Sequence, residues 1–187
     1  MLYIQPNNFL VNQLFSHNKW QSYSHKTKRQ DFRKENFRWN NKRQTNLTKN
    51  KIKCGALVFN IELDQIILVQ NNYSLMKGED KWGLPKGHRE GKETYATCAK
   101  RELYEETGIL EEIKDDMFKI RINNSYYFPL IIDKTNIKLN PIDKNEIAQA
   151  KWINITEIEN FNVNRETKIF IKRKLKGLVK SLKKGVS

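Results

Sequence analysis

The sequence predicts one α/β domain with a single core, and three observations lead to this fold class. Short β-rich runs alternate with a long helical pattern in the middle of the chain. The length of 187 residues suits one domain, and a hydrophobic share of 38% suffices to fill one modest core. The third observation is an amphipathic pattern near the C-terminus, which predicts a helix with one buried stripe.

The first 50 residues are expected to form a basic, aromatic-containing N-terminal extension outside this domain. Residues 1–50 carry ten Lys/Arg against two Asp/Glu, and residues 25–53 have no sustained helical or strand period. The segment lacks the apolar centre of a secretory signal, whereas a mitochondrial presequence stays open because the segment is basic and poor in acids. The domain itself is expected over residues 51–187.

Within the domain, the elements are predicted in the following order. Residues 55–59 and 65–70 are β-rich runs and predict adjacent strands, whereas residues 71–93 contain glycines and prolines and predict a loop. Residues 94–107 predict a helix ended by Gly108, and three more strands are expected at 118–123, 126–132 and 147–155. From 164 to 184, a helix is predicted by the apolar spacing of Ile171, Leu175, Leu178 and Leu182.

The net charge of +14 is concentrated at the two ends of the chain. Residues 1–50 and 164–187 each carry +8, which leaves the middle slightly acidic. Such ends predict a polyanionic partner, namely nucleic acid, an anionic membrane surface or a densely phosphorylated small molecule, while a solvated surface without a partner stays open. No apolar run reaches the roughly 18–20 residues of a membrane span, so a membrane-spanning protein is excluded.

The cysteine content bears on the compartment. The chain has two cysteines, Cys54 and Cys98, and their spacing fits neither a disulfide framework nor a metal knuckle. A reducing, intracellular setting is therefore expected, which places the protein in the cytoplasm.

Residues 87–109 contain a glycine, a glutamate six positions later and, after seven more residues, the run Arg-Glu-Leu-Tyr-Glu-Glu-Thr-Gly-Ile. On a helix, Glu102, Glu105 and Glu106 fall within an arc of about 100°. Ala96, Ala99 and Leu103 fall beside that arc, where they can face a sheet. Like charges at this spacing repel one another, and the helix dipole disfavours anions in the last turn. A divalent cation relieves both penalties, and carboxylate oxygens favour Mg²⁺ or Mn²⁺.

This pattern resembles the Nudix box, and the sequence fills every position that the box specifies. The probability of such a match by chance is on the order of one in 10⁸. The resemblance implies a Nudix fold, an α/β/α sandwich around a mixed β-sheet. It also implies metal-dependent hydrolysis of a nucleoside diphosphate linked to another moiety. In that family the metal ligands would be the backbone carbonyl of Gly87 and the side chains of Glu102, Glu105 and Glu106. Arg101 and Glu93 would orient the helix and loop through an ion pair.

The flanks at residues 53–56, 82–87, 98–108 and 145–152 resemble the mRNA-decapping Nudix enzymes. The resemblance implies that capped RNA is converted to m7GDP and 5′-monophosphate RNA. It also implies that Glu146 is the general base or an additional metal ligand, although an ordinary exposed acid stays open. The stretch around Lys86 and His88 is also similar to diadenosine and diphosphoinositol polyphosphate hydrolases, which remain alternatives. Virus-encoded decapping enzymes are similar to both groups.

One departure concerns the N-terminus, because cellular decapping enzymes carry a helical regulatory domain there and residues 1–50 are too few for it. Two sets of residues are nevertheless candidates for contacts to capped RNA. The phosphate contacts are expected from Lys86, Lys168, Lys172, Arg173, Lys176 and Lys180, the last five on the C-terminal helix where decapping enzymes bind RNA. The methylated base is expected to stack on aromatics of the extension, with Tyr3, Trp20, Tyr23 and Trp39 as candidates.

Trp82 and Trp152 are instead expected to pack near the box and the last strand. A non-catalytic RNA-binding module is the alternative from another class. Such modules usually lose box carboxylates, and here all of them are present.

Overall fold

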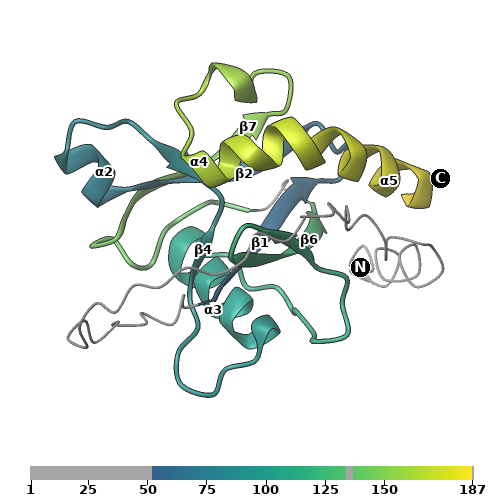
Figure 1. The fold of residues 1–187 in the computed structure, drawn as a ribbon, viewed down its shortest axis with the longest axis horizontal. Coiled ribbons are helices and arrows are strands. Elements are labelled where there is room, and N and C mark those ends of the chain that lie inside the picture. The colour runs from purple at the N-terminus through teal and green to yellow at the C-terminus, as the bar shows by residue number, and fades with distance from the viewer. Residues whose placement is uncertain (1–51, 134–136, 187) are drawn as a thin grey trace, which may run out of the picture.

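The computed structural model describes residues 52–133 and 137–186, which form one mixed sheet between two helical layers (Figure 1). The described strands are β1 (Lys53–Asn60), β2 (Gln65–Asn71), β3 (Trp82–Gly83), β4 (Lys86–His88), β5 (Ile120–Ile122), β6 (Ser125–Ile132) and β7 (Ile147–Asn154). Their order is β3-β2-β1-β6-β5, with β4 pairing β1 and β7 pairing β2. Because β1 runs parallel to β6 and antiparallel to β2 and β4, the sheet is mixed.

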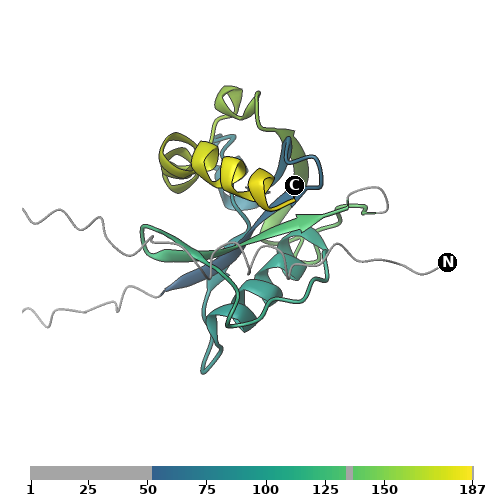
Figure 2. The ribbon, with the colours of Figure 1, turned by 90° about the vertical axis from the view of Figure 1, so that its right-hand side faces the viewer.

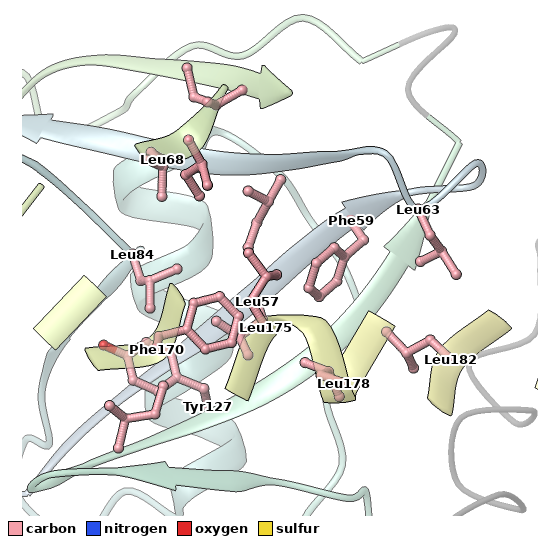
Figure 3. Packing of buried hydrophobic residues seen from close by; sticks show 14 of the residues in the cluster. Leu57, Phe59, Leu63, Leu68, Leu84, Tyr127, Phe170, Leu175, Leu178 and Leu182 are labelled. Carbon is pink, nitrogen blue, oxygen red and sulfur yellow. The ribbon is translucent and has the colours of Figure 1, made fainter. Parts of the chain in front are cut away.

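The alternation of side chains along β1 explains why helices cover both faces of the sheet. Cys54 and Val58 point into one core, which they share with α3 (Tyr95–Thr107). Leu57 and Phe59 point into the other core, which the C-terminal helices cover (Figure 3). Figure 2 shows the layers edge-on, with α3 below the sheet and the C-terminal helices above it. The expected α/β/α sandwich is confirmed.

The C-terminal segment consists of α4 (Arg165–Phe170), a π-helical turn (Ile171–Leu175) and α5 (Lys176–Val186). Leu175, Leu178 and Leu182 are buried against the sheet, as the apolar spacing predicts (Figure 3). The predicted amphipathic helix over residues 164–184 is present, with a π-helical turn at Ile171–Leu175, where the backbone hydrogen bonds span five residues instead of four. No helix in the described ranges is long and apolar enough to cross a membrane.

Residues 71–93, which are expected to be a loop, contain α2 (Asn72–Met76) and the strands β3 and β4. The Asn71 side chain caps α2 by accepting a hydrogen bond from the Tyr73 backbone N–H at 2.8 Å. A helix of five residues is too short to show a helical period, and strands of two or three residues are defined only by pairing with a neighbour. The loop prediction is therefore wrong for these three elements.

Both ends of α3 are fixed where the sequence expects. The Thr94 side chain caps the first turn, and Gly108 ends the helix with a left-handed φ of 78°. The first turn also contacts the sheet through stacked side chains. The rings of Tyr95 and Tyr126 stack with their centroids 4.7 Å apart. The guanidinium groups of Arg89 and Arg121 lie over the rings of Tyr95 and Tyr126, respectively. This anchorage fixes the position of the acidic turn of α3.

Candidate active site

Three glutamates of the last two turns of α3 form the acidic part of the candidate site. Glu102 and Glu106 are 6% and 5% exposed, whereas the Glu105 side chain is 39% exposed. The neighbouring stripe of α3 packs into the core against the sheet through Ala96, Ala99 and Leu103, as predicted. The sheet therefore holds the glutamates along one edge of the helix, with two of them largely removed from water.

Gly87 lies on β4, directly beside the carboxylate of Glu102. A Cβ atom at this position would overlap both carboxylate oxygens of Glu102. The glycine is required because the backbone approaches a side chain so closely, which the sequence alone did not indicate. The Gly87 carbonyl oxygen also lies 3.8 Å from the Cys98 sulfur of α3, so β4 and the helix are in direct contact.

Arg101 connects the acidic turn to the loop that precedes the helix. Its Nε lies 2.8 Å from Glu93 Oε1 and its Nη2 lies 3.1 Å from Glu93 Oε2, which is the two-pronged ion pair expected between these residues. The hydrogen bonds from Arg101 lower the pKa of Glu93 to about 2. The remaining nitrogen, Nη1, lies 2.7 Å from Glu102 Oε1 and 2.9 Å from Glu105 Oε2.

Two of the glutamates are poorly compensated in the protein alone. Burial raises the pKa of Glu106 to about 8, although its carboxylate accepts a hydrogen bond from the Lys86 backbone N–H at 2.8 Å. Burial also raises the pKa of Glu102, against the lowering effect of Arg101. These two carboxylates therefore gain from a further positive charge nearby, since burial disfavours their charged forms.

Residues 140–147 cap the C-terminal end of α3. The Glu105 carbonyl oxygen accepts hydrogen bonds from the backbone N–H groups of Ile142 at 2.8 Å and Asp143 at 3.0 Å. The Asp143 carboxylate in turn accepts the N–H groups of Asn145 at 3.0 Å and Glu146 at 3.1 Å. The carbonyls at the end of α3, which have no partner within the helix, thus position the loop that carries Glu146.

The same loop is held from its other side by α2. The backbone N–H of Asn72 donates to the Glu146 carbonyl oxygen at 2.7 Å, and its side-chain amide donates to the carbonyls of Lys144 at 2.7 Å and Asn145 at 3.1 Å. The Asn71 side-chain amide lies 3.4 Å from Glu146 Oε1. Glu146 is therefore positioned between α2 and the end of α3.

A cavity of about 650 Å³ lies between β4, α3 and the loop of residues 140–147. Six of the residues that the sequence singles out line it, namely Lys86, Gly87, Arg101, Glu102, Glu105 and Glu146. Six further lining residues were not predicted to belong to the site: Lys53, His88, Glu90, Ile142, Asp143 and Asn145. The spacing of Asp143 and Glu146 is that of a side chain that caps a backbone N–H three residues later. This spacing could have indicated that Asp143 holds the Glu146 loop. Lys53 and His88 meet only through the register of β1 and β4.

The basic residues of the C-terminal helices do not reach this cavity. Lys168, Lys172, Arg173, Lys176 and Lys180 are exposed, as expected, but they belong to the layer on the opposite face of the sheet from α3 (Figure 2). Lys168 and Lys172 line a separate cavity of about 240 Å³ beside Phe161.

The expected tryptophans lie on different faces of the sheet. Trp82 is buried in the core under the C-terminal helices, in edge contact with Phe161 at 5.9 Å between ring centroids. Trp152 on β7 packs against the core under α3. The candidates Tyr3, Trp20, Tyr23 and Trp39, with the rest of the N-terminal extension, lie outside the described residues.

The carboxylates that line the cavity offer oxygen ligands, which suit a hard divalent cation. Among the described residues, no three His, Cys, Asp or Glu side chains already surround a common point at metal-binding distance. The Nη1 nitrogen of Arg101 lies between the carboxylates of Glu102 and Glu105. A cation bound there would take over oxygens that Arg101 now contacts.

The sequence profile of the NUDIX domain matches residues 49–174, which is most of the chain and includes the whole cavity. The chain belongs to the Nudix family. Its Nudix fold is similar to that in the crystal structure of a UDP-X diphosphatase, with a TM-score of 0.50 and 19% identity over 73% of this chain and 64% of that one.

Two curated relatives of this Nudix chain differ in kind. It is 28% identical over 123 residues to "mRNA decapping complex subunit 2" of Schizosaccharomyces pombe, covering 59% of this chain and 15% of that protein. It is 33% identical over 108 residues to "Putative hydrolase 111R" of Invertebrate iridescent virus 3, covering 56% of this chain and 59% of that protein. The chain thus spans less than two thirds of the length of either relative.

Proposed function

We propose that this Nudix protein is a metal-dependent pyrophosphohydrolase that converts capped RNA to m7GDP and 5′-monophosphate RNA. The observation that carries the proposal is the convergence of the carboxylates of Glu102, Glu105 and Glu146 with two lysines, Lys53 and Lys86, on one cavity. The carboxylate of Glu106 accepts a hydrogen bond from the backbone of Lys86, which lines that cavity. Acidic groups that can hold a cation and basic groups that can hold phosphates are both required for cleavage of a phosphoric anhydride.

The proposed metal ligands are the backbone carbonyl of Gly87 and the carboxylates of Glu102, Glu105 and Glu106. Mg²⁺ or Mn²⁺ bound there supplies polarisation of the phosphoryl oxygens and a lower pKa for the attacking water. The fit is supported by the burial of Glu102 and Glu106, whose charged forms need a further cation. A cation held by Glu102 and Glu105 would replace the contacts of Arg101 Nη1 to these carboxylates, while the two contacts of Arg101 to Glu93 could remain.

In the proposed reaction, Glu146 accepts a proton from the water that attacks a phosphorus of the cap. The P–O bond to the departing phosphate of the RNA breaks, and the RNA leaves with a 5′ monophosphate. Glu146 suits the role of base because its loop is held by backbone contacts on both sides. Lys53 and Lys86 bind non-bridging oxygens of the phosphate chain and hold it against the carboxylates.

Three observations support capped RNA as the substrate. The chain carries a net charge of +14, and its exposed C-terminal lysines suit a long phosphate backbone. The decapping complex subunit 2 of S. pombe is among its relatives. Capped RNA also combines the short phosphate chain of the cap, which can fit the cavity, with a long RNA backbone, which can extend beyond it.

A second candidate is hydrolysis of diphosphoinositol or diadenosine polyphosphates. The observation that favours it is the location of the C-terminal basic residues, which lie on the opposite face of the sheet from α3 (Figure 2). A compact substrate needs only the cavity itself, where Lys53, Lys86 and His88 are already close together.

The test compares three substrates side by side in Mg²⁺, in Mn²⁺ and in EDTA: a cap-labelled RNA, diadenosine tetraphosphate and a diphosphoinositol phosphate. We expect metal-dependent release of m7GDP from the RNA as the fastest reaction. Glu105→Gln and Glu106→Gln should each lower kcat by several orders of magnitude, because the charge that holds the cation is lost. Full activity in EDTA or in these variants overturns metal-dependent hydrolysis, and faster cleavage of a small polyphosphate reassigns the substrate.

A further inference from the structure

The phosphate cavity offers little apolar surface for a nucleobase. Its lining consists of charged or polar side chains together with Gly87 and the exposed side chain of Ile142. A base attached to the phosphate chain must therefore bind beyond the rim, and an aromatic ring at the rim is the usual partner of a base. Such a ring must be exposed and must be held at a fixed distance from the cavity.

Tyr73 on α2 meets both conditions. Its side chain is 65% exposed, and the neighbouring Met76 is 86% exposed, so α2 presents an apolar surface to solvent. The helix projects from the sheet at the end of β2 (Figure 1). Its capping residue Asn71 and its first residue Asn72 are hydrogen-bonded to the loop that carries Glu146, as described above. The Asn71 side chain, which lies 3.4 Å from Glu146 Oε1, also accepts a hydrogen bond from the Tyr73 backbone N–H at 2.8 Å, so the backbone of Tyr73 is held beside the loop that carries Glu146.

The ring of Tyr73 already interacts with a positive charge. The Lys77 ammonium lies 4.3 Å from the ring centroid, which is the geometry of a cation–π contact. A methylated guanine is both aromatic and cationic, so it suits this ring better than a neutral base does. The ammonium of Lys77 has a mobile four-carbon chain and can leave the ring when a base stacks there.

We propose that Tyr73 is the stacking platform for the methylated guanine of the cap, at the rim of the phosphate cavity. This inference rests on the proposed function and specifies how its substrate is recognised. Binding there would direct the triphosphate of the cap toward Lys53 and Lys86, and would keep the bond to be cleaved beside Glu146.

The first experiment measures KM and kcat on two RNAs that differ only in the N7-methyl group of the cap. Tyr73→Ala should raise KM for the methylated RNA by roughly 5- to 100-fold, the usual range for loss of one base–aromatic stack, with little change in kcat. The rise should be smaller for the unmethylated RNA. Tyr73→Phe should restore KM, because the ring is kept and only the hydroxyl is lost.

The matched control is Tyr104→Ala, which removes another exposed tyrosine. Tyr104 lies on α3, about 200° around the helix from Glu102, so its loss should leave both KM values within about twofold of the wild type. Circular dichroism of each variant tests whether the fold is kept. A Tyr73→Phe variant with the same defect as Tyr73→Ala would overturn the platform, because an aromatic ring would then not be what matters.

The second experiment does not require hydrolysis. The dissociation constants of m7GDP and GDP are measured by calorimetry with the full chain. Tyr73→Ala should weaken the binding of m7GDP more than the binding of GDP. Equal weakening, or none, overturns the assignment even if capped RNA is cleaved. If the wild type cleaves no capped RNA but binds m7GDP through Tyr73, the platform stands and the proposed reaction falls.

Discussion

At Gly87 the backbone comes so close to the Glu102 carboxylate that a methyl group has no room. Gly87→Ala should therefore displace Glu102 and lower kcat/KM by about 10- to 100-fold, the usual effect of disturbing the support of a metal ligand. Steady-state kinetics with saturating Mg²⁺ measure this effect. The matched control is Gly177→Ala on α5, where an added Cβ meets nothing within 4 Å. It should keep full activity and gain about 0.5–1 kcal/mol of stability.

Glu146 is expected to act on the water and to contribute less to holding the metal. Glu146→Gln keeps the shape of the side chain, and should lower kcat by about 10²–10⁴-fold while leaving most of the metal affinity of α3 intact. Single-turnover kinetics and metal titration by calorimetry separate the two effects. Glu90→Gln removes another carboxylate from the same cavity and serves as the control. A loss below tenfold for Glu146→Gln would reassign Glu146 to a structural role.

At the scale of the elements, the ion pair between Glu93 and Arg101 joins the loop after β4 to α3. The hydrogen bonds from Arg101 lower the pKa of Glu93 to about 2, below the value of about 4.3 expected in the unfolded chain. Its stabilising contribution is therefore fully present above about pH 4.3 and is lost as the pH falls toward about 2. The free energy of unfolding, measured with urea, should fall more steeply across this pH window for the wild type than for Glu93→Gln. Parallel curves would mean that the pair adds no stability.

The exposed face of the C-terminal helices should act on long substrates only. Reversing the charges of Lys172 and Lys176 should raise KM for a capped RNA of tens of nucleotides, and hardly change cleavage of a free cap dinucleotide. The slope of the logarithm of the RNA association constant against the logarithm of the salt concentration should flatten by about 0.7 for each phosphate contact that is lost. Reversal of Lys114 and Lys138, which are also exposed, is the matched control. Equal effects of both pairs would point to net charge alone.

At the scale of the whole molecule, the sequence predicted what local patterns and fixed spacings determine. The long strands and α3 follow from hydrophobic periodicity and a capped end, and the acidic cluster follows from spacing on one helix. Elements defined by tertiary pairing were missed, including α2, β3 and β4. The position of Lys53 was missed for the same reason, because only the register of β1 and β4 brings it to the cavity.

The capping of α3 by residues 140–147 also has a consequence for the order of folding. Glu105 and Ile142 are far apart in the chain, yet their backbone contact determines where Glu146 lies. The parallel pairing of β1 with β6 is equally non-local, and such contacts form late because a long loop must close first. During refolding from urea, catalytic activity should therefore return with the slowest phase of tryptophan fluorescence. Helical circular dichroism should return earlier, so that helix-rich species formed first are inactive.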